Sequence, residues 1–272
     1  TKRGDKQHRY YCLRLNFNSN ALDMIKIENI SKSFGDNLVL DVISATFERG
    51  KTNLIIGQSG SGKTVLTKIC IGLFEPDSGI VTFDNRPFSN TKEKKRIDIR
   101  KEMGVLFQGG ALFDSMNVEQ NVMFPLNMFT DMSYEEKLER VNLCLDRVDL
   151  KGKNHLTTAE LSGGMMKRVA IARAISNSPK YLFCDEPNSG LDPITSEIID
   201  ELISEITAEY DMTTIINTHD INSVLKIGQT MNFLYKGKLW WTGDNKTIIS
   251  TDNKELNDFL FSTELTKRIK NN

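Results

Sequence analysis

Hydrophobic and polar positions alternate with a period of two over residues 24–30 (MIKIENI), which predicts a half-buried strand. Residues 38–48 indicate a second strand. Residues 53–56 form a short apolar run, typical of a buried strand, that leads directly into a glycine-rich loop. Further strands are expected at residues 80–83, 103–107 (ending at Gln108), 181–184, 213–218 and 231–235, and residues 236–237 form a turn before the apolar residues 239–241.

Helical spacing replaces this alternation in the middle of the chain. Ser133 and Glu136 have the spacing of a capping box, and the apolar positions that follow recur at helical intervals. We therefore expect residues from about 109 to 177 to be mainly helical. Another helix is predicted over about 62–73, after the glycine-rich loop.

Asp192 and Pro193 form a typical helix start, with an acidic cap followed by proline in the first turn. The apolar residues at helical spacing after them predict the buried stripe of this helix. They are Ile194, Ile198, Leu202 and Ile206.

Strands that alternate with helices favour an α/β fold with a largely parallel sheet. The first strands indicate a small antiparallel sheet beside it, and the helical stretch is an insert. We expect one domain over residues 24–250, with a helical subdomain at about 109–177. Residues 1–23 are polar and then Asn-rich, which suggests a loose arm or an artefact of the start position. Residues 251–272 form a charged, partly amphipathic tail.

Composition narrows the class of protein. A chain of 272 residues with 39% hydrophobic and 26% charged residues can form one large globular domain with a subdomain. The net charge of −1 argues against broad nucleic-acid binding, which usually requires a basic excess. The cysteines, Cys12, Cys70, Cys144 and Cys184, form no CxxC pair and are expected to be reduced thiols of a cytosolic protein.

The sequence contains neither the apolar core of a signal peptide nor a run of roughly 18 apolar residues. If the protein serves transport, the membrane path must therefore belong to another chain.

The glycine-rich loop matches the phosphate-binding pattern GxxxxGK[ST]. Glycines allow successive backbone N–H groups to face one anion, and the helix that follows adds its positive end. We expect Lys63 to reach the β- and γ-phosphates of a nucleotide and Thr64 to bind Mg²⁺. The alternative is a plain glycine-rich turn. The expected nucleotide contacts here are Gly57, Gln58, Ser59, Gly60, Ser61, Gly62, Lys63, Thr64 and, on the helix, Thr67.

Two acids end the apolar run 181–184, at the edge where open α/β sheets bind ligands. Asp185 is expected to hold Mg²⁺, and Glu186 is expected to act as general base toward the attacking water. A solvated acidic turn is the structural alternative.

A second glycine pair opens a helix in the stretch Leu161 to Met165. Ser162 can cap that helix, while Gly163 and Gly164 expose amides that could bind a γ-phosphate. Because the loop at residues 57–64 already completes one phosphate site, the ATP of a second subunit is the more economical target for Ser162, Gly163, Gly164 and Met165. An ordinary helix cap remains the alternative.

Three more residues are candidates with plainer alternatives. His219 ends the strand 213–218 and could orient the attacking water, or could be structural. Gln108 could contact Mg²⁺ or that water, or could be a surface glutamine. Phe34 could stack on adenine, or could be a core residue.

The segments 109–116 and 121–129 are unusually apolar. They predict either the core of the helical insert or a patch that receives a partner helix. The basic cluster at residues 92–96 is expected to be a solvated face.

Taken together, these residues resemble the ATPases of ABC transporters. The resemblance covers residues 24 to about 243 and includes the phosphate loop, Gln108, LSGGM, Asp185–Glu186, the segment 189–192 (SGLD) and His219. It implies a P-loop NTPase core of ABC type, with an antiparallel β subdomain and an inserted helical subdomain. It also implies ATP and Mg²⁺ as ligands, and a head-to-tail dimer of two copies. The implied roles are catalytic for Glu186, His219, Lys63 and Gln108, adenine stacking for Phe34, and Mg²⁺ binding for Thr64, Gln108 and Asp185.

LSGGM has methionine where many members of the family have glutamine, so Met165 cannot make the polar contacts of an amide. With the segments 109–118 and 185–195, this signature resembles the Mla/Mce-type subgroup, which serves phospholipid transport between bacterial envelope membranes. That resemblance implies an MlaE-like permease and an MCE-domain protein as partners, no nucleic acid, and a position at the cytoplasmic face of the inner membrane. The permease would select the cargo and the direction of transport.

Other functions stay open at this point. They are an importer ATPase for a small solute, an ABC ATPase that acts on nucleic acid or ribosomes, and a P-loop metabolic kinase. ABC ATPases of the second kind typically carry two cassettes or a long coiled coil, which this sequence lacks. A kinase would leave LSGGM and the segment 189–192 without a role.

Overall fold

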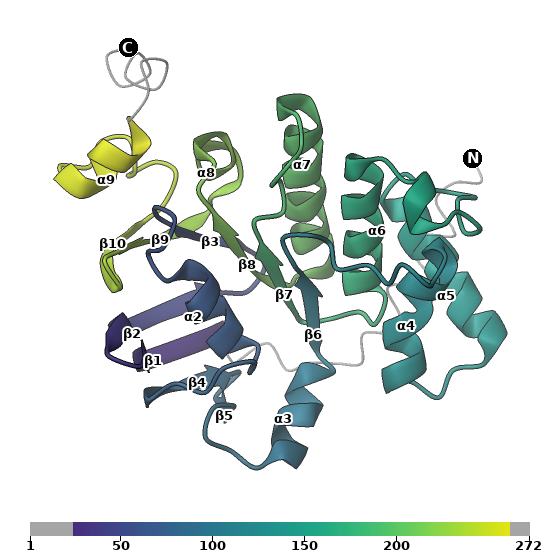
Figure 1. Ribbon diagram of the computed structural model, residues 1–272, viewed down its shortest axis with the longest axis horizontal. Coiled ribbons are helices and arrows are strands. Elements are labelled where there is room, and N and C mark those ends of the chain that lie inside the picture. Colours follow the sequence, from purple (N-terminus) through teal and green to yellow (C-terminus); the bar gives the residue numbers. More distant parts are fainter. Residues whose placement is uncertain (1–23, 262–272) are drawn as a thin grey trace.

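A six-stranded sheet forms the centre of the computed structural model, which describes residues 24–261 (Figure 1). The spatial order is β10-β9-β3-β8-β7-β6; β6, β7, β8, β3 and β9 are parallel, and β10 is antiparallel at one edge. The strands are β3 (Thr52–Ile56), β6 (Met103–Leu106), β7 (Tyr181–Asp185), β8 (Thr213–Thr218), β9 (Thr230–Tyr235) and β10 (Lys238–Gly243). The expected arm at residues 1–23 and the end of the tail, residues 262–272, lie outside the described residues.

Alternate residues of the central strands enter two different cores. Leu54 and Ile56 of β3 pack with the helices of one face, whereas Ile55 packs with the layer on the other face. The first face is covered by α6, α7 and α8, and the second by α2, α3 and a smaller sheet (Figure 1). The bounds are α2 (Lys63–Cys70), α3 (Glu93–Arg100), α6 (Gly163–Ile175), α7 (Pro193–Tyr210) and α8 (Ile221–Ile227). Burial on both faces explains why β3 and β7 contain the continuous apolar runs 54–56 and 181–184.

The smaller sheet is antiparallel, as the alternating sequence predicts. Its order is β2-β1-β4-β5, made of β1 (Met24–Phe34), β2 (Asn37–Glu48), β4 (Ser78–Phe83) and β5 (Arg86–Pro87). The fold class expected from the sequence is therefore confirmed.

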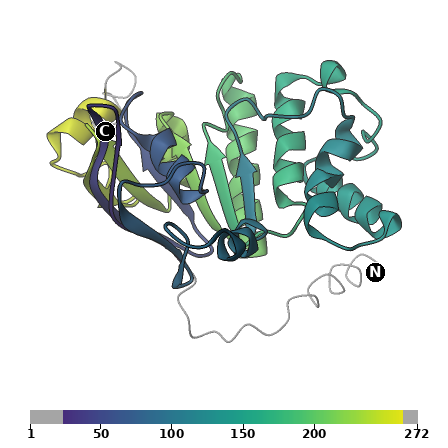
Figure 2. The same ribbon diagram turned by 60° about the horizontal axis from the view of Figure 1, so that its bottom comes forward.

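The expected helical stretch lies at the end of the molecule opposite the smaller sheet (Figure 2). It contains α4 (Val118–Phe129), α5 (Tyr134–Arg147), the short 3₁₀ helix η2 (Thr158–Glu160) and α6. The capping box of α5 is present: Ser133 Oγ accepts from the Glu136 backbone N–H at 3.2 Å, and Glu136 Oε2 accepts from the Ser133 N–H at 2.7 Å. The domain limits proposed from the sequence stay predictions.

The buried stripe expected on α7 is wrong in its first half. Ile194 is 73% and Ile198 is 49% exposed, whereas Ile199 and Ile203 are fully buried. The buried face of α7 also carries Ser196, Asp200 and Thr207, three polar residues that an apolar pattern does not reveal. A prediction from apolar residues alone therefore places the buried face of α7 partly on the side that contacts solvent.

Two smaller expectations also need correction. Helix α2 ends at Cys70 rather than near residue 73, because Gly72 adopts a φ of +75° that ends the helical path. The cluster at residues 92–96 is not wholly solvated: Arg96 is buried, forms an ion pair with Glu75 and lies 5.1 Å from the ring centre of Phe88.

Helix α9 (Lys254–Leu260) packs the first part of the tail against the main core. Leu256, Phe259 and Leu260 are buried there, and the Phe259 ring centre lies 5.6 Å from that of Phe233. Within residues 24–261, no helix combines the length and the apolar character that crossing a membrane requires.

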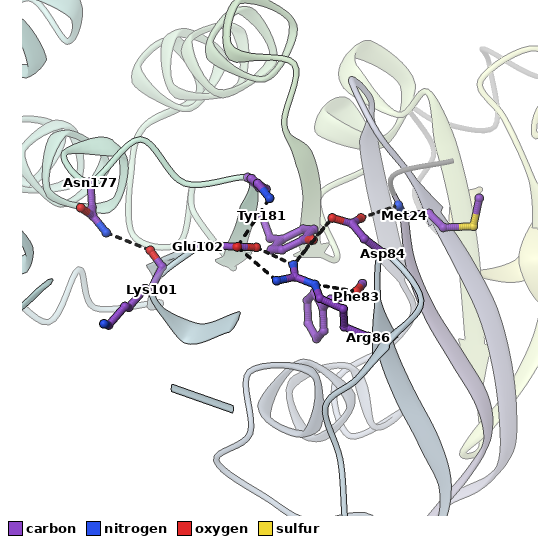
Figure 3. Close-up of polar contacts among 9 residues, drawn as sticks. Met24, Phe83, Asp84, Arg86, Lys101, Glu102, Asn177 and Tyr181 are labelled. Atoms are coloured by element: carbon purple, nitrogen blue, oxygen red, sulfur yellow. Dashed lines mark hydrogen bonds and ion pairs between the residues drawn. The ribbon is translucent and has the colours of Figure 1, made fainter. Parts of the chain in front are cut away.

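A polar network joins the two sheets at the start of β7 (Figure 3). The Tyr181 hydroxyl donates to Asp84 Oδ2 at 2.5 Å and accepts from Arg86 at 3.1 Å. Arg86 also forms two hydrogen bonds with the Glu102 carboxylate, at 3.1 and 2.5 Å. Tyr181 is only 1% exposed and the Asp84 side chain 15% exposed, so the bond between them has little access to water as a substitute partner, whereas Arg86 is 39% exposed.

We predict that Tyr181→Phe lowers the free energy of unfolding by about 1–3 kcal/mol, because it removes the buried hydroxyl that donates to the largely buried Asp84 carboxylate. Urea unfolding measures this loss. Tyr134→Phe is the matched control: it removes a hydroxyl that bonds Glu119 at 2.9 Å, but from a 57% exposed side chain. Its effect should stay within about 0.5 kcal/mol. Equal losses in both variants would contradict the role assigned to the network.

Burial raises the pKa of Tyr181 well above its ordinary value. The contribution of this phenol to stability is therefore complete below about pH 10 and declines above it, because only the unfolded chain releases the proton there. Tyr181→Phe should abolish that part of the alkaline loss.

Candidate active site

The glycine-rich loop follows β3 and turns sharply into α2. Gly57 has a φ of +149°, and a Cβ on it would lie 2.4 Å from the Leu234 carbonyl oxygen. Gly62, which precedes α2, has a φ of +105°, and a Cβ there would lie 2.7 Å from Leu40 Cδ2. Side chains are therefore excluded at both ends of the loop, which leaves its backbone amides available for an anion.

Lys63 lies at the first position of α2 and is 6% exposed. Its ammonium donates to the carbonyl oxygens of Gly57 at 2.7 Å and Gln58 at 3.0 Å. Burial lowers the pKa of Lys63, while the charges of Glu186 and Asp185 act in the opposite direction. A buried cation bound only to carbonyls, close to two acids, suits a phosphate ligand.

Asp185, at the end of β7, is held from two sides. Thr64 Oγ1 donates to Asp185 Oδ1 at 3.2 Å, and Asn217 Nδ2 donates to the same oxygen at 2.9 Å. A hydroxyl and a carboxylate in contact are oxygen ligands that Mg²⁺ prefers. Residues 24–261 contain no group of three or more His, Cys, Asp or Glu side chains that could hold a metal. The pair therefore fits a Mg²⁺ that completes its coordination with phosphate and water.

Glu186 adopts a left-handed backbone conformation, with a φ of +50°, directly after β7. Its backbone N–H donates to the Asn217 carbonyl at 3.0 Å, which holds the turn against β8. Its carboxylate lies 2.9 Å from His219 Nδ1, at the end of β8. The glutamate is 14% exposed at its side chain and the histidine 66%, so the pair faces a solvent-accessible space.

Gln108 lies two residues beyond the end of β6, rather than at the strand end that the sequence suggests. Its side chain donates to Ser189 Oγ at 3.2 Å. The loop that it opens is bound to α6 through three carbonyls. Lys167 donates to the backbone carbonyl oxygen of Gln108. Arg173 donates to the carbonyl oxygens of Gly110 at 2.6 Å and Ala111 at 2.8 Å. Burial lowers the pKa of both cations.

These elements surround one cleft of about 720 Å³, a size suited to a nucleotide. It opens at the carboxyl ends of the parallel strands, where β3, β8 and β7 lie side by side and β6 follows. Most of the predicted catalytic and loop residues come together here. The lining residues are Val39, Gln58, Ser59, Gly60, Gly62, Lys63, Thr64, Val65, Gln108, Glu186, His219, Ile221, Asp258 and Phe259.

Some predicted nucleotide contacts lie elsewhere. Thr67 does not line the cleft: its buried hydroxyl donates to Asn217 Oδ1 at 3.0 Å, so it supports Asp185 through that amide. Ser61 is also buried, and its hydroxyl has no hydrogen-bond partner within the described part of the chain. Phe34 is 44% exposed outside the lining and packs edge-on against Phe74, with ring centres 5.4 Å apart.

The LSGGM stretch also lies outside this cleft. Ser162 caps α6, because its Oγ accepts from the Met165 N–H at 3.3 Å, and both Ser162 and Gly163 are exposed. Gly164 packs closely against α7, where a Cβ would lie 2.8 Å from Thr195 Cγ2. The amino end of α6 is thus an exposed group of amides that does not line the phosphate cleft of its own chain.

Sequence reasoning missed several residues around the cleft. Asn217 joins Asp185, Thr67 and the turn at Glu186; its signal was an amide in a strand of otherwise β-branched residues. Asp258 and Phe259 reach the cleft from α9, and no local sequence motif predicts that they line it.

The sequence matches the family model described as ABC transporter over residues 40–189. The "Probable ribonucleotide transport ATP-binding protein mkl" of Mycobacterium tuberculosis (strain ATCC 25618 / H37Rv) is 36% identical over 236 residues, which cover 87% of this chain and 66% of that protein. The chain thus spans just under two thirds of that relative. The "Intermembrane phospholipid transport system ATP-binding protein MlaF" of Escherichia coli (strain K12) is 35% identical over 238 residues, 88% of each chain.

A solved structure with a similar fold is the dimeric ATP-binding cassette MJ0796 in a post-hydrolysis state, bound to ADP and Pi. It superposes with a TM-score of 0.74 at 31% identity and covers 81% of this chain and 98% of its own.

Proposed function

The chain belongs to the ATP-binding subunits of the ABC transporter family, and from this membership we propose that two copies of it hydrolyse ATP at shared sites to drive phospholipid transport. The family match and the relatives over most of the chain support the ATPase assignment. Separate observations support three parts of this proposal. They are the cleft within each copy, the site shared between two copies, and the phospholipid cargo.

The observation that carries the proposal is the separation of two phosphate-binding groups. One chain supplies the cleft with Lys63 and Glu186, while its exposed α6 amino end lies outside that cleft. A second copy placed head to tail would bring its Ser162, Gly163 and Gly164 to the open side of the bound nucleotide. The dimeric state of the similar cassette bound to ADP and Pi supports this arrangement.

Within the cleft, each side chain has a role that its contacts support. Lys63 neutralises phosphate charge, and Thr64 with Asp185 holds Mg²⁺, which would screen the phosphates when bound. Glu186 accepts a proton from the attacking water, and the contact with His219 fixes the direction of its carboxylate. Gln108 lies on the Ser189 side of the cleft, where it can contact the metal or the water.

The apolar segment after Gln108 is the proposed contact with a membrane permease. Asn121 of α4 fixes the loop, since its side chain bonds the backbone of Phe113 and Met116. Outward-facing apolar residues remain nearby: Phe113 and Phe129 are each 39% exposed and Met128 is 60% exposed. We propose that an MlaE-like permease binds here, which would place the chain at the cytoplasmic face of the inner membrane, with an MCE-domain protein in the same complex.

Phospholipid is the proposed cargo because MlaF bears that function in its name and aligns over 88% of both chains. The name of mkl supplies the second candidate, ribonucleotide transport, at a similar identity. A reconstituted complex separates the two. The chain would be purified with its membrane partners and inserted into vesicles that contain fluorescent phospholipid.

We expect ATP-dependent transfer of the lipid to an acceptor MCE-domain protein, and none when the complex carries Glu186→Gln. ATP-dependent accumulation of ribonucleotides without lipid transfer would favour the second candidate. Co-purification with ribosomes or nucleic acid, instead of a membrane protein, would contradict a transport function.

A further inference from the structure

Three buried polar side chains meet between α7, the start of α8 and the turn that follows β7. Asp200, on α7, accepts from Asn188 Nδ2 at 2.7 Å through Oδ1 and from Ser223 Oγ at 2.6 Å through Oδ2. Asn188 Nδ2 also lies 3.1 Å from Ser223 Oγ. The residues are 4%, 9% and 1% exposed, in the order Asp200, Asn188 and Ser223.

Each of the two donors lies beside one member of the Glu186–His219 pair. Asn188 follows Glu186 by two residues, in the turn between β7 and α7, and Ser223 follows His219 by four residues, in the first turn of α8. Asp200 contacts both segments from the middle of α7. That helix packs in the core through Ile199 and Ile203, so Asp200 extends from an element that the core holds in place.

The cluster has few alternative partners. Among the described residues, Asn188 Oδ1 has no hydrogen-bond partner, so the Asn188 side chain is oriented through its amide nitrogen alone. Burial raises the pKa of Asp200, whereas the hydrogen bonds from Ser223 and Asn188 lower it. An apolar residue at position 200 would leave both donors without this acceptor.

We propose that Asp200 is a positioning residue for hydrolysis, which holds the two backbone segments that carry Glu186 and His219 in register. The inference rests on the proposed function, because it assigns Glu186 the role of general base. The left-handed turn at Glu186 makes such support necessary: its φ of +50° is uncommon for a residue other than glycine.

The test compares kcat and KM for ATP in the purified full-length chain. Asp200→Leu should lower kcat at least about tenfold, because small misplacements of catalytic groups are costly. It should change KM less than about twofold, since the glycine loop and Lys63 are untouched. Asp200→Asn should retain most of the turnover: its oxygen can accept from Asn188 while its amide donates to Ser223.

Thr207→Val is the matched control. Thr207 lies on the same helix, is equally buried, and bonds the Ile203 carbonyl and Thr214 Oγ1, each at 2.7 Å. Its removal should cost stability and leave kcat unchanged. If Asp200→Leu does not fold, Ser223→Ala removes one donor only and should still lower kcat about threefold, with an unchanged KM.

A wild-type kcat in Asp200→Leu or Ser223→Ala would overturn the inference, and so would an equal fall of kcat in Thr207→Val. The proposed function fails separately, if the wild-type chain shows no ATP turnover or if Glu186→Gln retains it. With wild-type turnover present and Glu186→Gln inactive, only the role of Asp200 is in question.

Discussion

ATP turnover by Glu186→Gln should fall at least about a hundredfold, and the ATP-bound dimer should accumulate. The amide cannot accept the proton of the attacking water, but it has the shape of the carboxylate and can keep the contact with His219. Binding groups such as Lys63 are unaffected, so ATP still joins two copies and is no longer removed. Phosphate release measures the first effect, and light scattering after gel filtration with Mg²⁺ and ATP measures the second.

Glu205→Gln is the matched control for this variant. Glu205 lies on α7 and pairs with Arg147 at 3.1 Å, but its side chain is 65% exposed and lies outside the cleft lining. Exposed pairs contribute little, so turnover should match the wild-type chain. Undiminished hydrolysis by Glu186→Gln, with no stable dimer, would reject the assignment of the general base.

Two inactive variants should restore each other when mixed. Lys63→Met removes the phosphate contact of the cleft, and Ser162→Glu places a negative charge where the partner's γ-phosphate would lie. Each alone should lose at least about a hundredfold in turnover. In a mixed dimer, the intact cleft of one chain faces the intact α6 amino end of the other, so one complete site is regained.

Random pairing makes half of the dimers mixed, each with one of its two sites intact. If the sites work independently, the mixture should recover about a quarter of wild-type turnover. As a control, Lys63→Met mixed with the double variant Lys63→Met/Ser162→Glu should recover nothing, because no cleft is intact. A single variant Ser162→Glu with full activity would show that each chain works alone, and the shared site would have to be abandoned.

The sequence predicts those features of this molecule whose cause is local. The glycine loop is recognisable because backbone crowding at Gly57 and Gly62 excludes any side chain. Strands β3 and β7 are recognisable because burial on both faces leaves the continuous apolar runs 54–56 and 181–184. The capping box of α5 needs only Ser133 and Glu136, three residues apart.

Features that depend on packing between distant segments could not be predicted from the sequence. The buried face of α7 includes Asp200, whose partners lie 12 and 23 residues away, and excludes the apolar residue Ile194. Thr67 was expected at the nucleotide, but it bonds Asn217, 150 residues away. Periodicity carries no information on such contacts, because they are settled only when the sheet assembles.

Helix α6 is about 20 Å long, given its 13 residues. In the proposed dimer its amino end, with Ser162, would lie at the second copy, while Lys167 and Arg173 bind the loop after Gln108. Because one continuous helix joins the two contacts, a displacement of that loop by a docked permease would move the amino end with it. Transport of the cargo and closure of the dimer over ATP would then depend on the same movement of helix α6.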